Sequence, residues 1–406
     1  PYTIGETISQ CSLKLVMEET LIKWLENTDE KILFCAKSFI YRMSHNNHQW
    51  VKKVIQSFES YSKNIQLNFL QAISFSSQIY NLIEQLDEDL KTSYWVNIPW
   101  SKLQIEPDNV NLVIEKLVIF KRSLAAIKLF STISYAIDEK LKVDCNLLAK
   151  ALLDIELDPE YNKIKDLKGY SHDIYIAINY IQKEESLENE VIIKIEWFYL
   201  PLFRFDRFKP IFLEKNILEN PELFAQVLSW CTRSQGEIDR GEFKELDSRR
   251  EASVSLLDSL SKLPGQNNKK DIDYNTLKDW VIRARNTLKE LDRERIGDDE
   301  IGKLLVNAPV GTDNIWPHES VRDLLEDVQS SYIERGLENG IRNGRGVTVR
   351  SVYEGGRQEK ELAKKYQQDS KQISLLWPRT SRMLRSISET YKRDAWREDL
   401  EVELRG

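Results

Sequence analysis

The sequence predicts an all-α protein: an irregular, HEAT-like helical solenoid in its first half, followed by a glycine-interrupted helical module. Two observations favour this fold class. Apolar residues recur every three or four positions along most of the 406 residues, which is the period of a helix with one buried face. The composition, 41% hydrophobic with 10 Trp, 16 Tyr and 14 Phe, supplies enough apolar surface for folded cores and excludes large-scale disorder.

The helices of the N-terminal half are predicted in order from their apolar stripes. The first runs from Leu13 to Leu25, and the second covers 32–43, with Asp29 predicted as its cap. Similar stripes cover 51–90, 110–137, 146–155 and 174–181. We expect a connector between Pro99 and Pro107, and Asp108 is predicted to cap the helix that follows. A second capping position is Ser171 or Asp173, beside His172.

The segment 191–200 (VIIKIEWFYL) could form either a buried strand or a buried helix. No second strand-like run is available to pair with it, and an isolated strand is marginally stable. We therefore predict a buried helix that ends near Pro201. The next helix should start with Asn220 as its cap and Pro221 at its first position.

The composition changes near residue 236, which predicts two parts, a helical array over 1–235 and a C-terminal helical module over 236–406. Nine of the 15 glycines fall between Gly297 and Gly356, and no period typical of a named repeat family is present. Gly336, Gly340 and Gly344 have helical spacing, which allows close approach of a second helix or fraying into a loop. We favour helix up to about Gly340 and loop from there to Gly356.

Three further patterns in the C-terminal part predict local helix structure. Trp316-Pro317 and Trp377-Pro378 each precede a helical pattern, so proline in the first turn with tryptophan packed against the helix entry explains both pairs. The acidic run 298–300 suits a helix start, where carboxylates interact favourably with the helix dipole.

The residues that carry most enzyme chemistry are few and scattered. Cys11, Cys35, Cys145 and Cys231 form no paired motif and are expected to be reduced, buried thiols. His45 and His48 would share one helix face, but no further pair of ligands completes a zinc site. Phosphate-binding loops and the G-x-S-x-G turn are absent. Asp158 and Glu160 lack the hairpin of a nuclease. We expect no catalytic residues, no metal and no cofactor.

The charge distribution is the most informative electrostatic feature. Between Ile341 and Arg397 there are 14 Lys and Arg against 6 Asp and Glu, whereas the whole chain has a net charge of −7. This basic segment either pairs with the acidic remainder or binds phosphate groups. The aromatic residues Trp377, Tyr391 and Trp396 are expected at packing positions, with Leu384 and Ile387 turned to the core. The candidate residues for binding a partner or phosphate are Arg342, Arg345, Arg350, Arg379, Arg382, Arg385, Arg393 and Arg397.

Three stretches of the second half carry a resemblance to a known family. They are 195–203 with 220–224, then 279–302, and then a longer run through 316–323, 334–336, 345–348, 354–356 and 377–380. These stretches resemble the C-terminal helical region of a family of very large, poorly characterised bacterial multidomain proteins. The resemblance implies an architecture with further domains upstream, and it implies no active site. A link to phage defence is suggested by that multidomain style alone.

The function we expect is a non-catalytic scaffold or sensing module that binds a protein partner or other domains of the same large chain. Two alternatives are a nucleic-acid-binding module that uses the basic segment 341–397, and an enzyme with an unrecognised site. The sequence lacks a secretory signal pattern, starts at Pro1 and has no run of 18 apolar residues. We therefore expect a cytoplasmic segment of a larger protein with no membrane partner.

Overall fold

The protein is all-α, as its apolar periodicity predicts, and the computed structural model describes residues 14–45, 47–73, 75–99, 109–136, 142–164, 166–184, 186–203, 208–240, 248–344 and 354–405. Across these residues there is no β-strand beyond a single bridge between Gln266 and Ile272. No helix in the described part of the chain is long and apolar enough to cross a membrane. The chain divides into two compact units, residues 1–196 and 197–406.

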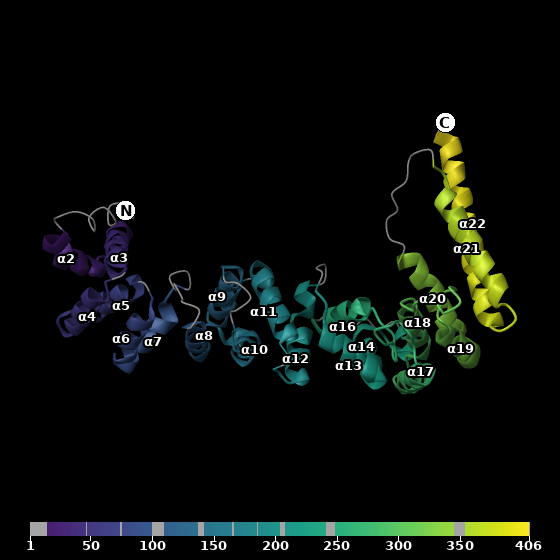
Figure 1. Ribbon diagram of the computed structural model, residues 1–406, viewed down its shortest axis with the longest axis horizontal. Helices are drawn as coiled ribbons and strands as arrows, with labels where there is room; N and C mark the ends of the chain where they lie inside the picture. Colours follow the sequence, from purple (N-terminus) through teal and green to yellow (C-terminus); the bar gives the residue numbers. More distant parts are fainter. Residues whose placement is uncertain are drawn as a thin grey trace. The chain divides into compact units, whose positions relative to one another are not determined.

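In the first unit, helices pack mostly on near neighbours in the sequence, for example α3 on α4 and α5, and α9 on α8, α10 and α11 (Figure 1). This is the contact pattern typical of helical arrays, and the finer HEAT-like assignment stays a prediction. The helices are α2 (Lys14–Lys23), α3 (Glu30–Ser44), α4 (His48–Gln56), α5 (Lys63–Ala72), α6 (Ser77–Glu84), α7 (Glu88–Asn97), α8 (Val110–Ile119), α9 (Ser123–Ala136), α10 (Cys145–Leu153), α11 (Ser171–Lys183) and α12 (Asn189–Tyr199), with short 3-10 turns between several of them.

Two buried polar side chains in the first unit form hydrogen bonds with backbone groups at the ends of helices. Asp158 is completely buried, and its carboxylate accepts a hydrogen bond of 2.8 Å from the Leu124 amide in the first turn of α9. Arg122 donates to the carbonyls of Trp95, Val96 and Ile98, where α7 ends. These groups would otherwise be unpaired and costly to bury. Asp158 therefore has a structural function.

The second unit contains α13 (Ile211–Glu219), α14 (Pro221–Cys231), α15 (Gln235–Asp239), α16 (Ser248–Ser259), α17 (Tyr274–Glu290), α18 (Glu294–Leu305), α19 (Glu319–Val328), α20 (Ser331–Gly344), α21 (Arg357–Ile373) and α22 (Pro378–Arg405). Helix α14 packs on α16 and α17, so the chain passes residue 236 inside one packed unit. The boundary between the two units in the sequence thus lies about forty residues before the predicted change near residue 236. Helices α21 and α22 lie side by side as a long hairpin (Figure 1).

Helices α18 and α20 cross through glycine. A Cβ atom on Gly336 would lie 2.0 Å from the carbonyl oxygen of Asp299, and one on Gly302 would lie 2.2 Å from that of Ile333. Side chains at these positions would separate the two backbones. Helix α20 also continues to Gly344 rather than ending near Gly340. Of the two alternatives for these glycines, close approach of a second helix is therefore the one that holds at Gly336. The candidate residues Arg345 and Arg350 lie outside the described residues.

Several local predictions are confirmed. Residues 191–199 are helical within α12, which is followed by a 3-10 turn from Leu200, although Phe198 of this segment is 41% exposed. Leu384 and Ile387 are buried. The Asp29 carboxylate accepts from the Lys31 amide at 2.8 Å, as a cap should. Pro221 and Pro378 both stand at first helical positions.

Other local predictions are wrong because the side chains interact with residues elsewhere in the fold. Asp298 lies inside α18, which starts at Glu294, and it is buried against Arg285. Asn220 occupies the cap position of α14, as predicted, but its side chain makes no capping bond and donates instead to the Asn216 carbonyl of α13. Pro317 lies before the cap residue of α19 and not in its first turn.

The caps predicted beside His172 are also wrong. The Ser171 hydroxyl donates to the carbonyl of Lys168, and the buried Asp173 carboxylate pairs with Lys128 at 2.7 Å. Neither side chain caps α11. Asp108 lies outside the described residues.

Candidate functional site

Four regions were candidates for a functional site: the histidines and cysteines, a cavity between α13 and α17, the glycine-rich crossing of α18 and α20, and the outer side of α22. Within the described ranges, no group of three or more His, Cys, Asp and Glu residues is arranged to hold a metal ion. His45 follows the last residue of α3, whereas His48 begins α4, so the two imidazoles do not share one helix face.

His318 is the histidine that sequence analysis missed, because its neighbours come from a distant loop. Its Nε2 atom lies 3.3 Å from Asp271, and its Nδ1 atom accepts a hydrogen bond of 3.2 Å from the Ser320 amide. Serine, histidine and aspartate therefore meet, as they do in hydrolases. The Ser320 hydroxyl, however, donates to the Ile272 carbonyl at 2.8 Å and not to the imidazole. This arrangement caps α19 and offers no activated nucleophile.

The described cysteines are also unsuited to nucleophilic chemistry. Burial raises the pKa of Cys35 and Cys145, and it raises the pKa of Cys231 to about 11. These thiols are protonated at neutral pH, and the thiolate is the form that attacks substrates.

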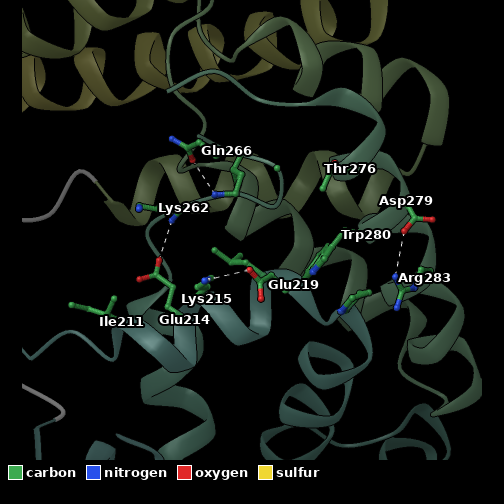
Figure 2. A pocket seen from close by; sticks show the side chains of 14 residues that line it. Ile211, Glu214, Lys215, Glu219, Lys262, Gln266, Thr276, Asp279, Trp280 and Arg283 are labelled. Carbon is green, nitrogen blue, oxygen red and sulfur yellow. Dashed lines mark hydrogen bonds and ion pairs between the residues drawn. The ribbon is translucent and has the colours of Figure 1, made fainter. Parts of the chain in front are cut away.

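A cavity of about 610 Å³ lies between α13, the loop 262–266 and α17 (Figure 2). Its floor is apolar and includes Trp280, whose indole nitrogen donates to the Ile217 carbonyl at 3.2 Å. Figure 2 shows that Glu214 and Lys215 reach it from α13, while Asp279 and Arg283 reach it from α17.

Several charged groups of this cavity already have protein partners. Glu214 accepts hydrogen bonds from the amides of Ser261 and Lys262. Arg283 makes two hydrogen bonds, of 2.9 and 3.0 Å, to Glu222. Paired charges of this kind hold the helices and the loop together. We therefore do not assign the cavity a reaction.

Helix α22 shows where the predicted arginines lie. Arg379 pairs with Glu334 of α20 at 2.6 Å, and Arg382 lies 3.9 Å from the same carboxylate. Arg385 is exposed and forms no ion pair with any described residue. Arg393 donates to Thr390, and Arg397 lies 3.9 Å from Asp394. Arg342 is exposed near the end of α20, one turn after Glu338.

The prediction that Trp396 packs against another helix is wrong. Its side chain is 65% exposed, whereas Tyr391 is buried and stacks on Tyr366 with ring centroids 5.9 Å apart. Leu400 and Leu404 follow Trp396 at intervals of four residues and are 37% and 78% exposed. Residues four apart lie on the same side of a helix, so the three form one apolar stripe.

The apolar stripe and the exposed arginines occupy one side of α22. At 3.6 residues per turn, positions 382, 385, 393, 396, 397, 400 and 404 fall within about a third of the helix circumference. The buried residues Leu384, Ile387, Tyr391 and Ala395 fall on the opposite side, toward α21. We call the exposed set, Arg382, Arg385, Arg393, Trp396, Arg397, Leu400 and Leu404, the outer face of α22.

The sequence was also compared with known proteins. No protein-family model, curated protein or solved structure matches it. The candidate site therefore depends on the geometry of the outer face of α22.

Proposed function

We propose that this protein is a non-catalytic partner-binding module whose outer face of α22 binds an acidic, amphipathic segment of another protein. The observation that carries the proposal is the exposure of Trp396, Leu400 and Leu404 among arginines. Large apolar side chains gathered in one place on a surface are typical of interaction sites, whereas scattered ones are ordinary. Tryptophan and arginine are also the residues that contribute most to binding energy at interfaces.

The charge of the outer face defines the partner. Its four arginines outnumber the two exposed glutamates on the same side of α22, Glu389 and Glu403, and Glu389 is already paired with Lys392 at 2.7 Å. An apolar stripe with a period of four matches a partner helix that carries its own stripe, as in helix-in-groove recognition. Acidic residues beside that stripe would meet Arg393 and Arg397. In the setting that the resemblance implies, the partner is a separate protein or another domain of a large bacterial chain.

Nucleic acid is the second candidate, because an exposed tryptophan among arginines can also stack on a base. Leucine provides no stacking surface of that kind, and two of the three exposed apolar residues are leucines. The outer face also has a single exposed aromatic ring. We therefore favour a protein partner.

The test is site-specific photocrosslinking in cells that express the full chain. A photoreactive residue replaces Leu400, and a matched one replaces Ile282, an exposed apolar residue of α17. We expect a protein adduct from position 400 that is absent from position 282. The R393E/R397E variant should lose this adduct, since reversed charges repel an acidic partner. The crosslinked peptide should be acidic and amphipathic.

The other outcomes each reject the proposal. An adduct with nucleic acid would replace the protein partner by the second candidate. An adduct between two copies of this chain would mean self-association. Equal crosslinking at positions 400 and 282, or no adduct at position 400, would mean that the outer face binds nothing specific.

A further inference from the structure

A second cluster of arginines lies outside the basic segment that sequence analysis identified. Arg233, Arg293, Arg295 and Arg335 line a cleft of about 610 Å³ that also contains Tyr332. Arg233 lies between α14 and α15, Arg293 between α17 and α18, Arg295 in the first turn of α18, and Tyr332 and Arg335 in α20. We call these five residues and the space between them the arginine–tyrosine cleft.

Two of these arginines share one aromatic ring. The guanidinium carbon of Arg335 lies 4.9 Å from the centroid of Tyr332, and that of Arg295 lies 5.9 Å from it. The ring attracts both cations and fixes them near each other. Two like charges held together repel one another, and this repulsion is relieved when an anion binds between them.

Both guanidinium groups retain free donors. Arg335 uses its Nε atom to pair with Asp299 at 3.0 Å, and its terminal nitrogens make no hydrogen bond to any described residue. Arg295 makes neither a hydrogen bond nor an ion pair within the described ranges, and its one contact of note is with Tyr332. Each arginine can therefore present a planar pair of donors to a bound oxyanion.

The backbone of the cleft favours the same charge. Helix α18 begins here, and its cap residue Arg293 has no side-chain acceptor for the first amides. Those amides and the helix dipole attract an anion. The Arg293 side chain is 9% exposed, donates to the carbonyls of Leu291 and Thr232, and lies 3.6 Å from the Glu237 carboxylate, while its buried Nε atom has no partner.

The anionic groups of the cleft leave the free N–H donors of Arg295 and Arg335 unoccupied. The Asp292 carboxylate accepts from the Gly236 amide at 2.8 Å, and Asp299 also lies 3.8 Å from Lys303. Glu294 is exposed in the first turn of α18 and opposes an incoming anion. Of the three carboxylates in the lining, Asp292 and Asp299 therefore have partners, and Glu294 is the one that an incoming anion would meet unpaired.

We propose that the arginine–tyrosine cleft binds a phosphate group that carries at least two negative charges. Two sources have this chemistry, a free nucleoside triphosphate and the 5′ phosphate at the end of a nucleic acid. Arginine matches the tetrahedral oxygens of phosphate with two parallel hydrogen bonds. This site is separate from the outer face of α22, so its ligand and the protein partner can be tested independently.

Isothermal titration calorimetry of the full chain with pyrophosphate tests the shared chemistry. We expect a Kd of about 1 mM or tighter near physiological salt. The R295Q/R335Q variant should bind at least about tenfold more weakly. The R357Q/K364Q variant removes two positive charges from α21 and should bind like wild type. Glu294→Gln should strengthen binding a few-fold, because it removes the opposing carboxylate.

The sources are separated by titrating ATP and by comparing oligonucleotides with and without a 5′ phosphate. A preference of about tenfold for the phosphorylated end would identify nucleic acid, and ATP binding without that preference would identify the nucleotide. Tyr332→Leu should also weaken pyrophosphate binding and serves as a second variant if the double variant unfolds. No binding of pyrophosphate, or equal binding by wild type, R295Q/R335Q and Y332L, would overturn the proposal.

Discussion

Arg322 illustrates how one buried charge can organise several segments. Its side chain is completely buried and makes hydrogen bonds to both carboxylate oxygens of Asp313 and to the carbonyls of Ile315 and Pro317. It also lies 4.9 Å from the centre of the Trp377 ring. Because four of its five N–H groups donate hydrogen bonds and a carboxylate balances its charge, the cost of burying the guanidinium is offset. The Arg322 guanidinium holds the pKa of Asp313 below its usual range.

The glycines of α20 provide a graded test at the residue scale. Gly336→Ala places a Cβ atom against the Asp299 backbone and should lower the free energy of unfolding by about 3 kcal/mol or more. Gly340→Leu meets the Val306 side chain, which can move, so we expect a loss of about 1–3 kcal/mol. Chemical denaturation of each variant measures both values.

Gly344 is the matched control, because an added Cβ there would meet nothing within 4 Å. Gly344→Ala should be neutral or stabilise the protein by up to about 1 kcal/mol, since alanine loses less backbone entropy in a helix. Equal stability of wild type, Gly336→Ala and Gly340→Leu would show that α18 and α20 do not pack closely in solution.

The sequence predicted residues whose partners are local and missed those whose partners are distant. Asp29 caps the helix that follows it directly, so its short-range pattern was sufficient. Asp298 is paired with Arg285 on another helix, and no spacing in the sequence reveals that contact. Trp396 was misplaced for a related reason, since periodicity defines the sides of α22 but not which side is covered.

At the scale of elements, Glu326 fixes the start of α22. Its carboxylate accepts from the amides of Arg379 and Thr380 at 2.9 and 3.0 Å, so a side chain of α19 caps a helix far along the chain. Glu326→Ala should lower the free energy of unfolding by about 0.5–2 kcal/mol, the usual range for a lost cap. Hydrogen exchange at the amides of residues 379 and 380 should accelerate.

Glu361→Ala is the control for this experiment. Glu361 is exposed and lies 3.6 Å from Arg357 in an ion pair within α21. Its replacement should leave exchange at residues 379 and 380 unchanged. If Glu326→Ala also left that exchange unchanged, the hairpin would be held to α19 by other contacts.

Helices were predicted better than their ends. The 3.6-residue period depends only on which side is apolar, and it correctly gave an all-α fold and a helix at 191–200. Helix starts depend on which side chain reaches the first amides. At α22 that side chain is Glu326, which no local motif identifies.

At the scale of the molecule, the net charge of −7 is distributed unevenly, with the basic segment near the C-terminal end. Sequence analysis predicted this excess of positive charge and left two roles open for the arginines, pairing with the acidic remainder of the chain or binding a partner. Arg379 and Arg382 pair with Glu334, which supports charge balance within the chain, whereas the exposed outer face of α22 supports a partner. The arginine–tyrosine cleft was missed because its arginines come from separate elements in a segment of mixed charge.

The variant R379Q/R382Q/R385Q separates these uses in the full chain. We expect its free energy of unfolding to fall by about 2 kcal/mol, chiefly through Arg379, whose hydrogen bond and ion pair to the largely buried Glu334 are lost. Fluorescence polarisation with single- and double-stranded oligonucleotides lacking 5′ phosphates should show no micromolar binding by wild type near physiological salt. Micromolar binding by wild type that this variant loses, with a flatter dependence on salt, would make α22 a nucleic-acid interface.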